Sequence, residues 1–230
     1  MRFARRFLAP IALLLAAVPA AAQLRAGEWV SYRDAYRAMV RFEKFGGAKN
    51  LLVSQLQVLP AERGALGDGA RLALAGKATQ LNLPLDALGR TVLPLQKSAY
   101  DENAALVLNR NGVPFTVVPR VTIAPRTDGH YDSADLRTAC GQALAYARYV
   151  DASQAARQCV GVRFVFAPKV ASGVRLRHAD GQEQLLAALP GAAFGAEAEE
   201  VVPVATWRFG TERAQVTMHD APLAIVPVFE

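Results

Sequence analysis

Short runs of alternating apolar residues, separated by turn-forming residues, recur along most of this chain. Between Asn50 and Pro125 the runs are rich in Val, Leu, Ile and Thr, and Gly, Pro, Asn or Asp interrupts them. Successive side chains on a strand point to opposite faces of a sheet, so this pattern is typical of half-buried antiparallel strands. The same pattern resumes after residue 159. The sequence therefore predicts an antiparallel, sandwich-like core.

Two segments have helical spacing instead, which makes the expected fold class α+β and mainly β. The first helix is expected at about 32–45, where Ser31 and Asp34 can act as a capping pair before an apolar face. The second is expected at about 134–149, with Asp132 or Ser133 as its cap. Farther along, an Asp-Gly pair at 180–181 between two strand-like arms predicts a hairpin.

Residues 1–22 have the three parts of a secretory signal peptide. Arginines at the start precede an unbroken apolar run from Ile11 to Val18, and small residues at 20–22 precede Gln23. The apolar part is shorter than the roughly 20 residues of a membrane-spanning helix. We therefore expect cleavage after Ala22 and a periplasmic or secreted protein that is not integral to a membrane.

Removal of this segment changes the charge of the chain. Without its three arginines, the 26 basic residues fall to 23 against 20 acidic ones, a net charge of +3. A nearly balanced chain without a long basic run is unlike a nucleic-acid-binding protein. Nucleic acid is therefore not expected as a partner.

The expected domain boundary depends on one stretch that contains Pro and Gly. Residues 167–173 are the best candidate boundary, which gives a domain at 23–168 and a C-terminal β region at 169–230. The alternative is that both regions belong to one domain.

The two cysteines of the chain are expected to form a disulfide. Cys140 lies on the apolar face of the second expected helix, and Cys159 begins the strand that follows. An exported protein folds in an oxidising compartment, where a disulfide is the usual state of two cysteines. A nucleophilic cysteine would need a nearby histidine, which neither neighbourhood provides.

A basic stripe lies along the first expected helix. Arg33, Arg37 and Arg41 stand four residues apart, and Lys44 follows. One interpretation is a site for lipid headgroups, peptidoglycan carboxylates or an acidic partner. The other is a solvated face whose charge is balanced by acids nearby.

An acidic cluster precedes the second expected helix. Asp128, His130, Asp132 and Asp135 fall within eight residues. Clustered carboxylates can bind calcium, but this spacing does not match the calcium loop. No metal or cofactor is expected.

The catalytic residue patterns that we looked for are absent from the sequence. It contains no G-x-S-x-G elbow, no H-E-x-x-H pair, no phosphate-binding loop and no dinucleotide fingerprint. A hydrolase of peptidoglycan or polysaccharide remains the alternative. Its cleft would gather members of one set: Asp101, Glu102, His130, Asp132 and His178. On a strand, the adjacent Asp101 and Glu102 would point to opposite faces and could not both flank one bond, so the other interpretation is a polar turn that opens a strand.

Four segments carry a resemblance: YRDAYRAMVRFEKFGGAKNLL, LNLPLDALGRTVLPLQKSAYDENAALVLNRNG, DLRTACGQALAYAR and CVGVRFVF. They resemble a family of uncharacterised exported proteobacterial proteins, a domain of unknown function, over residues 28–229. The segment LPLDALGRTVLPL is also similar to a strand-turn-strand of transthyretin-like or immunoglobulin-like modules. The resemblance implies a β-sandwich and no particular activity.

The sequence thus favours a non-catalytic binding or structural module of the cell envelope. Its partner would be an envelope protein, a glycan or a lipid surface. Pairing at a sheet edge is one available mode of binding.

The expected signal peptide at residues 1–22 leads to a direct prediction. The mature protein should begin at Gln23, because signal peptidase cuts after small residues. Intact mass and N-terminal sequencing of protein recovered from a Gram-negative periplasm measure this. A chain that still carries residues 1–22 would contradict it.

Overall fold

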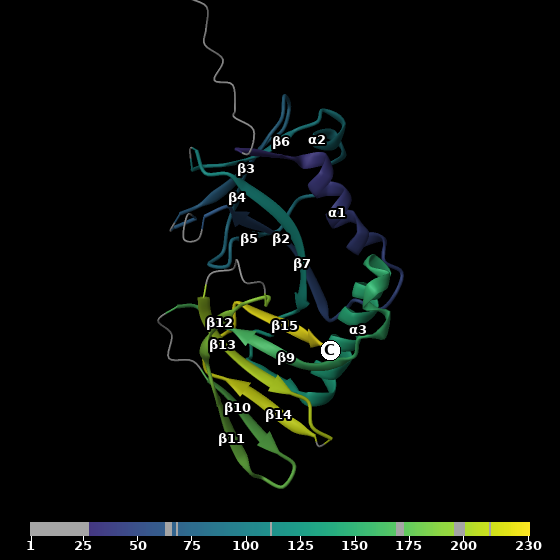
Figure 1. Cartoon of the computed structure of the whole chain (residues 1–230), viewed down its shortest axis with the longest axis vertical. Helices are drawn as coiled ribbons and strands as arrows, with labels where there is room; N and C mark the ends of the chain where they lie inside the picture. Colours follow the sequence, from purple (N-terminus) through teal and green to yellow (C-terminus); the bar gives the residue numbers. More distant parts are fainter. Residues whose placement is uncertain are drawn as a thin grey trace, which may run out of the picture.

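Two long antiparallel strands, β2 (Leu52–Pro60) and β7 (Phe115–Ile123), run through the centre of the molecule. The computed structural model describes residues 28–62, 66–67, 69–110, 112–168, 173–195, 201–211 and 213–230, so the predicted leader lies outside the described residues. All of β2 pairs with β7, from Leu52 opposite Ile123 to Pro60 opposite Phe115. In Figure 1, β7 passes from the upper part of the molecule to the lower part.

The largest sheet contains seven strands in the order β12-β13-β9-β15-β7-β2-β5, and all of its pairings are antiparallel. Its other strands are β5 (Arg90–Thr91), β9 (Cys159–Val165), β12 (Leu189–Ala192), β13 (Val201–Arg208) and β15 (Ala224–Phe229). A side chain at Gly161 of β9 would collide with the carbonyl oxygen of Trp207. Glycine at this position therefore allows β9 to approach β13.

The first core lies at the upper end of the β2–β7 pair. A sheet of order β1-β6-β3-β4 packs there, with strands β1 (Trp29–Ser31), β3 (Arg71–Ala75), β4 (Gln80–Pro84) and β6 (Ala105–Leu108). Two helices, α1 (Tyr32–Lys44) and α2 (Lys97–Asp101), cover it. Its largest buried side chains are Tyr32, Met39, Leu56, Leu72, Leu74, Leu106 and Phe115.

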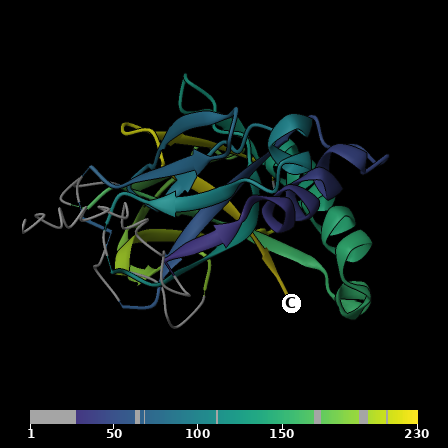
Figure 2. The same ribbon diagram turned by 90° about the horizontal axis from the view of Figure 1, so that it is seen from above.

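The second core lies at the lower end, between the seven-stranded sheet and a sheet of order β11-β10-β14-β8. The latter contains β8 (His130–Asp132), β10 (Gly173–His178), β11 (Glu183–Ala187) and β14 (Ala214–Met218). Helix α3 (Ser133–Val150) closes this core, and a short 3-10 helix (Ala152–Ala156) follows it. Viewed from above, α1 and α3 lie on the same side of the strands (Figure 2).

These elements confirm the expected fold class and the two expected helices. The Ser31 hydroxyl accepts a hydrogen bond from the Asp34 N–H, so the predicted N-cap of α1 is present. For α3, Asp132 occupies the N-cap position, but its side chain makes no cap hydrogen bond. Ser133 instead accepts a hydrogen bond from the Ala214 N–H and ties α3 to β14. The hairpin at 180–181 is also confirmed, with Gly181 at a φ of +83°.

The polar segment at 101–103 does precede a strand, β6, but the sequence did not predict the helix before it. Residues 97–101 form the additional helix α2, and Glu102 is its C-cap. This helix is a little over one turn long, too short to show helical periodicity. The buried Ala99 fixes it against the first core.

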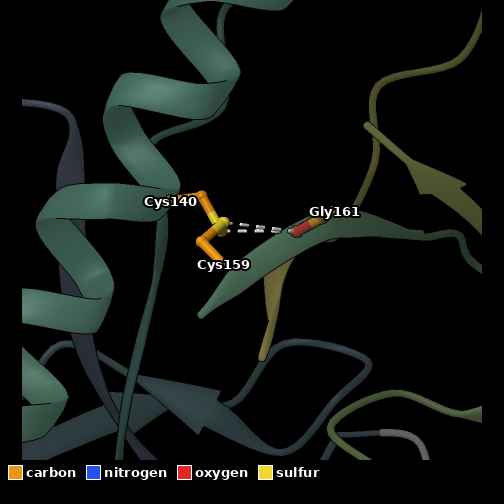
Figure 3. Close-up of a disulfide and its surroundings, with 3 residues drawn as sticks. All are labelled: Cys140, Cys159 and Gly161. Atoms are coloured by element: carbon orange, nitrogen blue, oxygen red, sulfur yellow. Dashed lines mark hydrogen bonds between the residues drawn. A yellow bond between two sulfur atoms is a disulfide. The ribbon is translucent and has the colours of Figure 1, made fainter. Parts of the chain in front are cut away.

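The predicted disulfide between Cys140 and Cys159 is present. It joins α3 to the start of β9, with a Cα–Cα distance of 6.0 Å. The carbonyl oxygen of Gly161 lies beside the bridge, 3.4 Å from Sγ of Cys140 (Figure 3). The disulfide therefore attaches the helix that covers the second core to the centre of the large sheet.

A buried arginine on β5 links the turn before that strand to the segment before β15. Arg90 is 4% exposed, and its guanidinium donates two hydrogen bonds to Asp86, at 3.0 and 2.8 Å. It also donates to the carbonyl oxygen of Leu223, which precedes β15. A buried charge is tolerated when its partners satisfy it in this way.

The domain boundary at 167–173 stays a prediction. Strands before and after it share one sheet, since β9 pairs with both β13 and β15. The two largest cores of the described chain lie at the two ends of the β2–β7 pair rather than before and after residue 168. A smaller third cluster also joins residues from both sides of residue 168, among them Val165 and Ala224.

The disulfide gives a stability prediction. Replacing Cys140 and Cys159 together by Ala should lower the free energy of unfolding by about 3 kcal/mol, the chain-entropy value for closing a loop of this length. Urea denaturation measures this. Reductant should destabilise the wild type and leave the double variant unchanged. An equal response of both proteins would contradict a structural role for the bridge.

Candidate functional site

The acidic cluster before α3 is neutralised by an arginine. Arg126 contacts Asp128 at 3.3 Å and Asp135 at 3.7 Å. The Asp128 carboxylate accepts the His130 N–H at 3.0 Å, and this bond, followed by Arg126, lowers the pKa of Asp128. Asp128 thus supports the turn that precedes β8. Within the part of the chain that the structure describes, no group of three or more His, Cys, Asp or Glu residues could hold a metal ion.

Two adjoining hollows lie between the start of α3 and the neighbouring sheet. Their volumes are about 450 Å³ and 280 Å³, and His178 and Ala214 line both. Asp132 lines the larger one, so two of the five groups expected for a hydrolase share a hollow. The Ser133 side chain there is buried and already bonded to Ala214. The Ser133 hydroxyl oxygen accepts that bond, which holds α3 against β14 at the wall of the hollow.

The other two carboxylates of that set lie at the end of α2, on the surface beside the first core. Asp101 forms an ion pair with Lys97 at 2.5 Å on α2. Glu102 accepts the Ala78 N–H at 3.0 Å and so holds the turn between β3 and β4. Both are separated from Asp132 and His178 by the length of the β2–β7 pair. The structure does not gather the five groups into one cleft.

The basic stripe divides into two halves. Arg33 donates to the carbonyl oxygen of Tyr100 at 3.2 and 3.1 Å and lies 5.0 Å from the centre of its ring. Arg37 donates to the Tyr100 hydroxyl at 3.2 Å and forms an ion pair with Asp34. These two arginines hold α2 against α1. Their guanidinium groups are therefore engaged within the chain, by Tyr100 and Asp34.

The other half of the stripe points into solvent. Arg41 and Lys44 are exposed, and neither forms an ion pair with a described residue. Nearby, Lys49 donates to the carbonyl oxygens of Phe42 and Glu43 and thereby caps the end of α1. Because Lys49 donates hydrogen bonds to these carbonyl oxygens, Arg41 and Lys44 are not required to cap the C-terminal end of α1.

Aromatic side chains from α1 and α3 meet beside these two cations. Phe45 packs on Tyr146 and Tyr149, with ring centroids 5.5 and 5.3 Å apart. Tyr146 is buried, and burial raises the pKa of its hydroxyl while the nearby Arg41 charge lowers it. Tyr149 is 55% exposed and Val150 is 41% exposed. We name Arg41, Lys44, Phe45, Tyr149 and Val150 the basic–aromatic end.

A second exposed feature is an edge strand. Strand β11 pairs on one side with β10, and no described strand pairs with its other side. Leu185 at its centre is 69% exposed. The sequence analysis anticipated exposed sheet edges in general but named neither this strand nor Tyr149. The alternating residues after the 180–181 hairpin and the aromatics at the two helix ends were the available signals.

Comparisons with known proteins give no relatives: no family model, curated protein or solved structure matches this chain. The resemblance to uncharacterised exported proteins therefore stays a prediction. Among the described helices, none has the length and apolar character needed to cross a membrane.

Glu102 gives a prediction for acid pH. Its hydrogen bond from Ala78 lowers the pKa of the carboxyl below the ordinary 4.5. A lowered folded-state pKa means that the ionised form stabilises the fold above pH 4.5 and that this contribution is lost as the pH falls through the folded-state value. Glu102→Gln should therefore destabilise the protein at neutral pH, and its stability should approach that of the wild type in acid.

Thermal melts between pH 7 and pH 3 measure this convergence. Glu43→Gln, on the exposed face of α1, is the matched control and should follow the wild type at all pH values. A gap between Glu102→Gln and wild type that is the same at every pH would contradict the role of the Glu102 carboxylate.

Proposed function

We propose that the chain is an exported, non-catalytic binding module of the cell envelope, and that it docks on an anionic lipid surface through the basic–aromatic end. The observation that carries the proposal is the pair of exposed cations, Arg41 and Lys44, beside exposed Tyr149 and Val150. The contrast with Arg33 and Arg37, which are engaged by Tyr100, supports it.

The charges favour an anionic partner. Arg41 and Lys44 are three residues apart on α1, so they lie on one face of the helix. A basic residue close to an anionic membrane contributes about 1 kcal/mol of binding free energy. Two such residues give about 2 kcal/mol, which is roughly a thirtyfold preference for an anionic over a neutral surface.

The apolar part of the end favours lipid over a purely polar partner. Tyrosine has an apolar ring and a polar hydroxyl, which suits the boundary between headgroups and acyl chains. Val150 next to it adds aliphatic surface, and the half-buried Phe45 supports the Tyr149 ring from α1. Such a combination of cations, aromatics and aliphatics is typical of interfacial binding.

The basic–aromatic end is already ordered before it binds a partner. Phe45 follows α1 and Tyr149 lies in α3, so their contact exists only in the folded chain. The disulfide at Cys140 attaches α3 to β9. A surface that is already ordered loses less conformational entropy on binding.

Vesicle sedimentation tests the proposal. Purified protein should sediment with vesicles of equal parts phosphatidylglycerol and phosphatidylcholine, and the bound fraction should fall with salt because the attraction is screened. Arg41→Glu with Lys44→Glu should reduce the bound fraction about tenfold or more. Tyr149→Ala should weaken binding without abolishing it.

The matched control reverses two exposed charges elsewhere. Arg71→Glu with Lys77→Glu, on β3 and the turn after it, makes the same change in net charge and should leave binding unchanged. Equal binding to pure phosphatidylcholine, or equal losses in both double variants, would contradict docking through the basic–aromatic end.

A further inference from the structure

Strand β11 has three residues whose backbone N–H and C=O groups are not used by its pairing with β10. The His178 N–H bonds the carbonyl oxygen of Gln182, which makes 178 and 182 a hydrogen-bonded pair. Such pairs alternate with non-bonded pairs along an antiparallel ladder. With the observed register, the backbone groups of Glu183, Leu185 and Ala187 therefore point away from β10.

The other sheet edges of similar length carry features that block pairing. On β4, the Gly76–Thr79 bond and the register make Gln80, Asn82 and Pro84 the outward residues, and Pro84 has no N–H. Strand β12 contains Pro190. The remaining described edges, β1, β5 and β8, are two or three residues long. Strand β11 combines five residues, no proline and an exposed leucine at its centre.

We propose that β11 pairs antiparallel with β11 of a second copy of this chain, with Leu185 opposite the same residue of that copy. This register uses all three outward residues of each strand, because Glu183 then faces Ala187 of the second copy. Each facing pair exchanges both of its backbone hydrogen bonds. The two lower sheets join into one continuous sheet across a two-fold axis.

The side chains of β11 fit this register. Leu185 stands opposite Arg175 on the solvent face of the sheet, so the two leucines meet beside each other across the axis. No like charges face each other, since each Glu183 is opposite an alanine. Glu183 is already neutralised within its own chain by Arg175 at 3.2 Å. In this register β11 is complementary to an antiparallel copy of itself. This favours a second copy of the chain as the partner of this edge.

Sedimentation velocity over a range of protein concentrations tests the pairing. The wild type should shift from monomer to dimer as concentration rises. Leu185→Pro should stay monomeric at every concentration, because it removes an outward N–H without breaking a bond to β10. Asn82→Pro makes the same change at an outward position of β4 and should dimerise as the wild type does. Far-UV circular dichroism verifies that both variants are folded.

A second pair of variants tests the register itself. Leu185→Lys and Leu185→Glu should each be monomeric, because like charges would face each other across the axis. A mixture of the two proteins should form a heterodimer, because opposite charges then face each other. Three results would each overturn the proposal. They are a wild type that is monomeric at all concentrations, a Leu185→Pro variant that dimerises like the wild type, and a mixture of the two charged variants that stays monomeric. None of these results depends on vesicle binding.

Discussion

The β2–β7 ladder is the interaction on which the rest of the structure depends. Nine residues of each strand pair in one unbroken register, so the two strands span the molecule from one end to the other. At one end, Leu56, Val58 and Phe115 enter the first core. At the other end, Leu52 and Ile123 enter the second. A backbone ladder cannot slip by one residue without turning every side chain to the opposite face, so the ladder fixes both cores together.

The proposed functional surfaces follow from this scaffold because each is built from elements that the cores position. Helix α1 covers the first core and α3 covers the second, and their ends meet where Phe45 contacts Tyr149. The disulfide at Cys140 and the buried Arg90 tie the peripheral elements to the large sheet on its two faces. Strand β11 ends the order of the lower sheet, and no described strand pairs with its outer side.

Local signals in the sequence predicted the fold well and the sites poorly. Helix α1 was predictable because Ser31 caps it and its apolar spacing is regular. The disulfide was predictable because two cysteines in a chain with the pattern of a signal peptide are expected to pair. Helix α2 was not, since it is too short to show a period. The division of the basic stripe depends on Tyr100, which lies 67 residues after Arg33. Such a partner is set by the tertiary fold and leaves no local pattern.

The central claim is that the β2–β7 ladder makes the two cores one cooperative unit, and the two tryptophans of the chain test it most directly. Trp29 lies in β1 beside the first core, and Trp207 lies in the second. In the Trp207→Phe and Trp29→Phe variants, tryptophan fluorescence reports one end of the molecule at a time during urea unfolding. We predict that each fluorescence midpoint coincides with the far-UV circular dichroism midpoint of the same variant. Separate fluorescence and circular dichroism transitions in either variant would contradict it.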